Sequence, residues 1–484
     1  MYPKQSLSPI LPTEPAVTPQ RRRFILAIGL AAIALAIVIG TLPFTQATHA
    51  LEPPRKFNPA DVRLADGYRL QAAFANLNAP TTALFDGDDF IVAESSSPAR
   101  IIRIKPDGTV TPIVNRGLRG PVAGLALKDG ALYVSHKGKV SVVDADGKLR
   151  DILTDLPSEG EHQNNHIAVG PDGKLYLAQG TITNAGVVGL DDYALGWLDL
   201  HPDLREIPCE DVPLLGQNYR TQNPFSQEPG SMVLTGAYEA FGIPTIIGAT
   251  AKGNLKCGGS ILRFNPDGSN LELVAWGLRN PVGLQFDRAG QLWVTSQGTE
   301  PRGSRSILND PDYLVRIERG AWYGWPDYFD GRPVTDERFQ VPGKSPPGFL
   351  WDAHPRLSQA FLTFAPQQAT SGFAFSPGAA FGFEGDAFVA MAGPLAVADD
   401  SNPSGFRIAR VDLVNRQAYD FATNAETGPA YRNSSGGFDH PADILFGPDG
   451  SMYVVDPGVP AVTAQGVKYA PGTGVIWRIY RPHP

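Results

Sequence analysis

The sequence contains very little sulfur. Its 484 residues include four methionines and only two cysteines, Cys209 and Cys257. No Cys-x-x-Cys-His stretch occurs, which excludes covalently attached haem. No histidine stands at metal-ligand spacing from either cysteine, so the pair does not predict a zinc site.

Concentrated positive charge is also missing from the body of the chain. The formal net charge is −8, and residues 1–50 hold four basic residues and one acidic residue, so the rest is more acidic still. Beyond residue 50 no run of Lys and Arg interleaves with aromatic residues. Because binding to a phosphate backbone needs clustered cations, we expect no nucleic-acid partner.

Helical periodicity is absent beyond residue 50, which disfavours a sheet covered by crossover helices. What recurs is an alternating apolar run, a turn that usually contains Asp-Gly, and a second alternating run, a strong signal for a β-hairpin. These turns are Pro106-Asp107-Gly108, Asp146-Gly147, Pro171-Asp172-Gly173, Pro266-Asp267-Gly268, the variant Arg288-Ala289-Gly290, and Pro448-Asp449-Gly450.

Hairpins that recur every ~40–50 residues are typical of propeller blades. From Leu64 onward the chain has room for six blades of four strands, so we predict an all-β, six-bladed β-propeller over residues 64–484. Residues 181–256 break the alternation and are rich in Gly, Pro, Asn and Thr. We therefore expect them to form an insertion. A second irregular stretch, Ala392–Ser404, divides another hairpin.

One long uncharged run, Phe24–Leu42, has 19 residues, enough to cross a bilayer as a helix. Arg21-Arg22-Arg23 precede it, which predicts that residues 1–23 stay in the cytoplasm while the body lies outside. Two interpretations are open: a transmembrane anchor, or a twin-arginine signal peptide cleaved after Ala50. Either one predicts a periplasmic or extracytoplasmic location, with residues 43–63 as a linker.

The predicted export bears on the two cysteines. In an oxidising compartment, a lone cysteine pair separated by a long loop is expected to form a disulfide. We predict a bond between Cys209 and Cys257 that joins the ends of the insertion.

Three local clusters contain residue types suited to chemistry. In Glu161–His166, His162 is the better candidate base because a neutral imidazole titrates near neutrality, whereas His166 begins a predicted strand. Arg279 and Asn280 stand at a turn before a strand, where a guanidinium can bind an anion or a carbonyl.

The third cluster is Gln297-Gly298-Thr299, whose backbone carbonyls at a strand end can bind a hard cation such as calcium. Each cluster taken alone is equally compatible with a polar loop or a structural turn. Nearby aromatic residues are either core packing or a platform for a flat ligand; they are Trp322, Tyr323, Trp325 and Tyr328.

Taken in order, these clusters resemble the soluble quinoprotein glucose dehydrogenases and, more broadly, the glucose/sorbosone dehydrogenase family. The resemblance covers most of the chain from about Leu64 and is strongest over residues 161–180 and 257–326. The matching segments are His-Gln followed by Val-Gly-Pro-Asp-Gly-Lys-Leu-Tyr, Gly-Leu-Arg-Asn-Pro-Val-Gly-Leu, Ser-Gln-Gly, and Gly-Ala-Trp-Tyr-Gly-Trp-Pro, which resembles the family's Gly-Asn-Tyr-Gly-Trp-Pro. Members of this family are six-bladed propellers that use pyrroloquinoline quinone (PQQ) and calcium.

The resemblance implies an exported quinoprotein dehydrogenase. It would oxidise a sugar of the aldose or sorbosone kind, or a related aldehyde or alcohol, by proton abstraction and hydride transfer to PQQ. An external acceptor would then take the electrons. The implied roles are catalytic for His162 and Arg279, quinone binding for Asn280 and Gln297, and calcium binding for the carbonyls of Gly298 and Thr299.

The chain departs from the family pattern where the base is oriented and where the quinone carboxylates are anchored. Thr181 replaces an acidic residue, His440-Pro441-Ala442 replaces Arg-x-Arg, and no lysine stands around Met391–Pro394. Candidate substitutes for these cations are Arg302, Arg305 and Lys468.

Two other functions therefore remain open. A calcium-dependent propeller hydrolase, acting on lactones or phosphoesters, would need several carboxylates around one metal. The candidates are Asp312, Asp352, Asp443 and Asp456. The other alternative is a non-catalytic scaffold that kept the fold and lost the cofactor.

Overall fold

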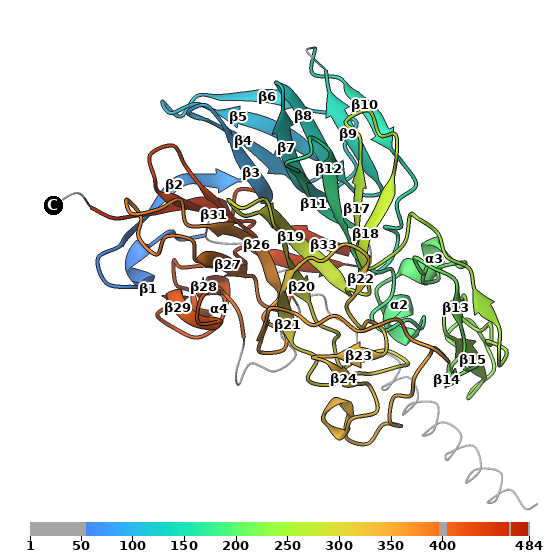
Figure 1. The fold of residues 1–484 in the computed structure, drawn as a ribbon. Coiled ribbons are helices and arrows are strands. Elements are labelled where there is room, and N and C mark those ends of the chain that lie inside the picture. The colour runs from blue at the N-terminus through green and yellow to red at the C-terminus, as the bar shows by residue number, and fades with distance from the viewer. Residues whose placement is uncertain (1–54, 145, 396–403, 464–465, 483–484) are drawn as a thin grey trace, which may run out of the picture. The chain divides into compact units, whose positions relative to one another are not determined.

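The computed structural model describes residues 55–144, 146–395, 404–463 and 466–482, and these are nearly all β. Six sheets contain four or five strands each. The innermost strands of neighbouring sheets contact one another in a closed ring, and Figure 1 shows the sheets arranged around it. The prediction of a six-bladed β-propeller is thereby confirmed.

Each blade is named from its innermost strand outward. Blade 1 has β3 (Pro80–Asp86), β4 (Asp89–Glu94), β5 (Arg100–Ile104) and β6 (Val110–Val114), and blade 2 has β7 (Val122–Lys128), β8 (Ala131–His136), β9 (Lys139–Val143) and β10 (Leu149–Leu153). Blade 3 has β11 (Asn164–Val169), β12 (Leu175–Gln179), β17 (Ser260–Phe264), β18 (Glu272–Trp276) and β22 (Ala321–Trp322). Blade 4 has β19 (Asn280–Phe286), β20 (Leu292–Gln297), β21 (Asp312–Arg316) and β25 (Leu362–Phe364). Blade 5 has β26 (Thr370–Phe375), β27 (Ala387–Met391), β28 (Arg407–Asp412), β29 (Gln417–Asn424) and β1 (Val62–Leu64). Blade 6 has β30 (Asp443–Phe446), β31 (Met452–Asp456), β34 (Gly474–Tyr480) and β2 (Arg69–Leu77).

Short elements connect or extend the blades. Between β12 and β17 lie α2 (Leu190–Ala194), α3 (Trp197–Leu200), β13 (Val212–Pro213), β14 (Asn218–Gln222), β15 (Met232–Gly236) and β16 (Thr250–Ala251). The others are η1 (Pro59–Asp61), β23 (Tyr328–Phe329), β24 (Arg332–Pro333), η2 (Glu337–Phe339), α4 (Ala430–Asn433), and the hairpin of β32 (Pro460–Thr463) and β33 (Gly466–Tyr469).

The Asp-Gly turns connect paired strands, as their local chemistry requires. In the turn between β17 and β18, Asp267 Oδ1 accepts the backbone N–H of Ser269 at 2.9 Å. Gly268 follows with a φ of +89°, and a Cβ atom there would lie 1.9 Å from the carbonyl oxygen of Ile152. Only glycine fits this position without strain, both for its backbone angle and for its close contact with blade 2.

The hydrophobic core lies between adjacent blades. Phe388 of β27 and Trp477 of β34 are fully buried in one cluster, which joins blades 5 and 6. Ile91 and Val134 are buried in the same way between blades 1 and 2. Each blade packs against a neighbour on both of its faces, so both faces of its sheet are buried. The ring therefore gives the connecting loops a rigid base.

The N-terminal part of the described chain closes the ring. Strand β2 is the outermost strand of blade 6, where it pairs with β34, and β1 pairs with β29 of blade 5. The predicted linker over residues 43–63 was therefore too long at its C-terminal end. Val62 is buried and its backbone completes the exposed edge of β29, so these residues belong to the propeller.

The predicted membrane anchor or signal, Phe24–Leu42, lies outside the described residues. Within the described ranges, no helix has both the length and the apolar character needed to span a bilayer.

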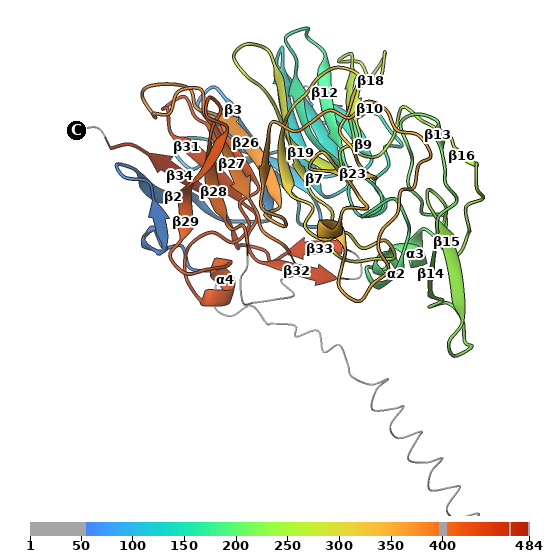
Figure 2. The same cartoon turned by 60° about the horizontal axis from the view of Figure 1, so that its bottom comes forward.

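All innermost strands begin on one face of the propeller, here called the entry face. The insertion leaves this face after β12 and returns at β17, and the β32–β33 hairpin follows β31 on the same face. Figure 2 shows α2, α3, β14, β15, the β32–β33 hairpin and α4 together on this side. The loops of the entry face are thus the part of the fold that can enclose a site.

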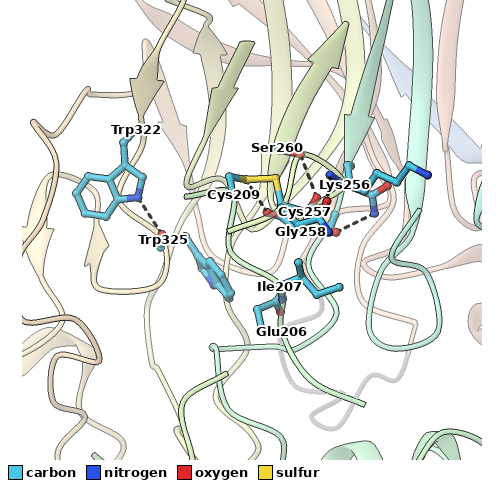
Figure 3. The surroundings of a disulfide bond; sticks show 12 residues. Glu206, Ile207, Cys209, Lys256, Cys257, Gly258, Ser260, Trp322 and Trp325 are labelled. Carbon is cyan, nitrogen blue, oxygen red and sulfur yellow. Dashed lines mark hydrogen bonds between the residues drawn. A yellow bond between two sulfur atoms is a disulfide. The ribbon is translucent and has the colours of Figure 1, made fainter. Parts of the chain in front are cut away.

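A disulfide joins the middle of the insertion to its C-terminal end. Cys209 and Cys257 are bonded, with Cα atoms 4.9 Å apart, which confirms the predicted bridge. Both are buried in a cluster that contains Trp322, and Figure 3 shows the bridge near Trp322 and Trp325. The insertion is therefore covalently tied to the strand entry of blade 3.

Candidate functional site

The predicted site residues approach one another on the entry face. His162 lies two residues before β11, Asn280 is the first residue of β19, and Gln297 is the last of β20. A Cβ atom at Gly180 would lie 2.4 Å from the Cβ of His162 and 2.6 Å from Oδ1 of Asn280. The glycine therefore allows the candidate base and the amide, from neighbouring blades, to come close together.

His162 is held in its uncharged form. Its side chain is 14% exposed, and its Nε2 is buried without a hydrogen-bond partner. Burial lowers the pKa of His162 well below its ordinary value, and the charges of Arg279 and Arg302 lower it further. The backbone N–H of His162 donates to the carbonyl of Thr181 at 3.0 Å, which fixes the loop although Thr181 cannot supply a charge. A neutral imidazole with a free ring nitrogen can accept a proton.

Arg279 is a buried cation that holds the site together. Its Nη1 donates to the carbonyl of Gly298 at 2.7 Å, and its Nη2 donates to Oδ1 of Asn184 at 2.8 Å. The same nitrogen lies 3.1 Å from Oε1 of Glu161. The guanidinium thus connects the base loop, the insertion and the end of β20, and its position beside His162 helps keep the imidazole neutral.

A second arginine, Arg302, completes a charged network that sequence reasoning did not find. It forms an ion pair with Glu161, and it also pairs with Asp191 and Glu300 at 2.8 Å each. Burial raises the pKa of Glu161 in spite of these cations, and its Oε2 has no partner. Asp191 comes from the insertion, so no local pattern could have predicted the network.

The predicted amides form a chain across the tunnel entry. Asn280 Nδ2 donates to Oε1 of Gln297 at 2.8 Å, and Asn165 Nδ2 donates to Oδ1 of Asn280 at 2.9 Å. Gln297 Nε2 donates to the carbonyl of Thr370 at 3.2 Å. Three blades are linked in this way. Asn165 lies three residues after the predicted base, but its hydrogen bond to a residue of another blade could not be predicted from the sequence.

The proposed calcium ligands have other partners. The Gly298 carbonyl accepts from Arg279, so a cation bound there would lie beside a guanidinium. The N–H of Thr299 donates to Asp310, and Thr299 Oγ1 is buried without a partner. Burial raises the pKa of Asp310 to about 7 and that of Asp312 to about 6, which reduces their negative charge. A cation at this position would also have to compete with Arg279 for the Gly298 carbonyl.

The residues fit the ring of a quinone better than its carboxylates. Arg279 and Arg302 are paired with carboxylates, and Arg305 is fully buried in an ion pair of its own. His440 makes one side-chain hydrogen bond, from Nδ1 to a backbone carbonyl, and its buried Nε2 has no partner. Burial lowers the pKa of His440 to about 4, so this residue is neutral. Unpaired nitrogens on His162 and His440 nevertheless leave room for hydrogen bonds to a polar organic ligand.

A cavity of about 440 Å³ is lined by five of the inner strands, and His166 of β11 is among its lining residues. It is not lined by His162, Arg279, Asn280 or Gln297. His166 Nε2 lies 3.9 Å from Oδ1 of Asp443, whose Oδ2 accepts from Thr82 at 2.7 Å. His166 therefore lines this cavity, and it is the third residue of β11, whereas the sequence predicted it to be the first.

The aromatic cluster divides between the two expected roles. Trp322 is buried in the core. Tyr323, Trp325 and Tyr328 line a second cavity of about 460 Å³ between blades 3 and 4. Arg279 also lines this cavity, whereas His162 does not.

The carboxylates considered for a hydrolase are scattered. Asp312 accepts N–H groups at the end of blade 4, Asp443 accepts from blade 1, and Asp456 pairs with Arg55. Asp352 is exposed in a loop. Among the described residues, no group of three or more His, Cys, Asp or Glu side chains is placed to hold a metal. The structure thus gives the hydrolase alternative no support.

Comparison with known proteins agrees with the fold and with the resemblance seen in the sequence. The glucose/sorbosone dehydrogenase family model matches residues 248–457. Quinoprotein glucose dehydrogenase B from Acinetobacter calcoaceticus is 25% identical over 298 residues, which are 54% of this chain and 53% of that protein. The chain therefore spans about half the length of this curated relative.

Solved structures share the fold at low sequence identity. The holo form of the PQQ domain of pyranose dehydrogenase from Coprinopsis cinerea aligns with a TM-score of 0.55 and 14% identity, over 89% of this chain and 98% of that one. A calcium structure of a Carbohydrate-Active Enzymes Family AA12 protein from Trichoderma reesei aligns with a TM-score of 0.53 and 15% identity, over 89% and 100%.

Proposed function

Because the chain is similar to the glucose/sorbosone dehydrogenases, we propose that it is a quinoprotein sugar dehydrogenase with His162 as the base. The curated relative is a quinoprotein glucose dehydrogenase, which supports an oxidoreductase of this class. The observation that carries the proposal is the neutral His162, whose buried Nε2 has no partner and which lies beside Asn280.

In the proposed reaction, His162 Nε2 accepts the proton of a sugar hydroxyl while the hydrogen on the same carbon leaves as hydride. PQQ, when bound, supplies the two-electron acceptor, and an external acceptor then removes the electrons. The carbon–oxygen single bond becomes a carbonyl, so an aldose yields a lactone and an alcohol yields an aldehyde. Removal of the proton and hydride together avoids a free alkoxide.

The neighbouring residues have supporting roles in this proposal. Burial, with the charges of Arg279 and Arg302, keeps His162 uncharged in the absence of substrate. Glu161 pairs with both arginines, so that neither repels the imidazolium strongly once it forms. Asn280 and Gln297 would hold the quinone through their amides. Calcium, which the resemblance implies, would use the carbonyls of Gly298 and Thr299 and would have to displace the hydrogen bond from Arg279 to Gly298.

Dye-linked sugar oxidation tests this proposal. Purified protein is incubated with PQQ and calcium and assayed with aldoses and a soluble dye. We expect His162→Ala to lower the rate by roughly 10²–10⁴, the usual contribution of a general base. His201→Ala is the matched control, because His201 is a half-exposed histidine of the insertion paired with Glu159 and distant in sequence from the base. Equal activity of the two variants would contradict the role of His162.

Uptake of PQQ is measured separately by its absorbance on the purified protein. Absence of uptake with calcium in excess would support the scaffold alternative, which the pairing of Arg279 and Arg302 with carboxylates favours. Extracytoplasmic location is also part of the proposal. It is tested by fractionation, in which recovery of the folded body in the cytosol would contradict it.

A further inference from the structure

The insertion carries a concentration of exposed hydrophobic residues. Of the 14 large hydrophobic side chains that are exposed in the described residues, seven lie between Phe225 and Leu255. Ile246 and Ile247 are 78% and 81% exposed. Monomeric soluble proteins rarely expose a contiguous apolar patch without a binding role.

The backbone geometry brings the segments that carry five of these side chains to one face of the β14–β15 hairpin. Met232 and Leu234 lie on the same face of β15 as Gly236, because alternate residues of a strand share a face. A Cβ atom at Gly236 would lie 2.2 Å from the backbone nitrogen of Thr245, so the next segment of chain crosses this face. That segment begins with Ile243, whose carbonyl accepts the N–H of Gly236 at 2.9 Å. The insertion patch is therefore made of Met232, Leu234, Ile243, Ile246 and Ile247.

The insertion patch lies on the side of the propeller to which the N-terminal segment is attached. Arg55, the first described residue, pairs with Asp439 and Asp456. Asp439 lies four residues before β30 and Asp456 ends β31, both on the entry face. The insertion emerges from the same face, as Figure 2 shows for β14 and β15. Chain attachment and apolar surface thus share one face.

The sequence before Arg55 limits how far this face can lie from a membrane. If residues 24–42 are the predicted anchor, only residues 43–54 connect it to the propeller. Twelve residues span at most ~40 Å when fully extended. A tether of this length allows the entry face to reach the bilayer surface.

We propose that the insertion patch docks on the lipid bilayer and enters its interfacial region. Isoleucine, leucine and methionine side chains are suited to the boundary between headgroups and acyl chains. Arg220, which pairs with Leu234 across β14 and β15, is exposed on the same face and can contact anionic headgroups. The docked propeller would present its site beside the membrane. This inference rests on the predicted anchor and is independent of the proposed reaction.

The test places a fluorescent probe on the patch of the full chain. Ile247→Cys and, separately, Ile246→Cys are labelled with an environment-sensitive dye; the native cysteines do not react because they are bridged. The matched control is Val414→Cys, which is 90% exposed on the turn between β28 and β29, on the opposite face. Labelled proteins are reconstituted in vesicles of phosphatidylcholine and phosphatidylglycerol, with and without brominated lipid.

We expect a blue shift and quenching by brominated lipid at positions 246 and 247, and neither at 414. Adding Met232→Ser and Leu234→Ser to the labelled Ile247→Cys protein should reduce the quenching, with an unchanged thermal midpoint as the check on folding. Three results would each overturn the proposal. The first is equal quenching at positions 247 and 414. The second is a blue shift without quenching by the lipid, which would indicate a protein partner or a second copy. The third is failure of the full chain to float with vesicles.

Discussion

Replacing Arg55 by methionine should greatly destabilise the propeller. The guanidinium is 2% exposed and lies 2.8 Å from Asp439 Oδ2 and 2.7 Å from Asp456 Oδ2. It also donates to the carbonyls of Gly437 and Thr473 at 2.8 Å each. Methionine keeps most of the apolar stem but leaves two buried carboxylates and two carbonyl groups without this partner.

The size of the effect follows from burial. Removing one partner of a buried ion pair costs about 3–5 kcal/mol, because the remaining charge is left uncompensated in a medium of low polarity. Arg288→Met is the control: its pair with Glu384 has side chains 64% and 63% exposed, and exposed pairs contribute about 0–1 kcal/mol. Urea unfolding of the full chain at neutral pH, followed by tryptophan fluorescence, measures both.

The loss should also depend on pH. In the wild-type protein burial raises the pKa of Asp439 to about 7, whereas the Arg55 charge and hydrogen bond outweigh burial and lower the pKa of Asp456. Without Arg55, burial and mutual repulsion raise both pKa values above those of the unfolded chain. The folded variant then binds more protons than the unfolded one, so its deficit grows as the pH rises above about 4 and shrinks on acidification. A loss below ~1 kcal/mol, or one independent of pH, would refute this reasoning.

Two further predictions concern the site and the insertion. Burial and the charges of Arg279 and Arg302 lower the pKa of His162. The acid limb of the kcat/KM profile should therefore lie below the ordinary histidine value of about 6.5, and Arg302→Gln should move it to higher pH. An acid limb that this change does not move would contradict the electrostatic role of Arg302. Replacing Cys209 and Cys257 by serine opens a loop with a sequence separation of 48 residues. This should lower the free energy of unfolding by roughly 4 kcal/mol, measured by urea titration under non-reducing conditions. An unchanged midpoint would show that the bridge contributes no stability.

Several features of the fold could be predicted because their causes are local. Asp267 and Gly268 illustrate this: an Asp side chain that caps the next N–H, followed by a residue with positive φ, makes a hairpin wherever it stands. Repetition of such hairpins predicted the blades. The start of the propeller could not be read in this way, because the strand at Val62 is defined by an edge of β29, which lies far away in the sequence.

The sequence by itself determined the six hairpins, the insertion over residues 181–256, the cysteine pair, and the order of His162, Arg279, Asn280 and Gln297 along the chain. Only the tertiary structure decided what these side chains do. The neutrality of His162 comes from burial and from two arginines that are held by Glu161 and by Asp191 of the insertion. The same network occupies the carbonyl of Gly298 with a hydrogen bond from Arg279, and it pairs Arg302, a candidate cation for the quinone carboxylates, with Glu161. Turns depend on neighbours in sequence, whereas charge, solvation and the choice of hydrogen-bond partner depend on which distant segments the closed ring brings together.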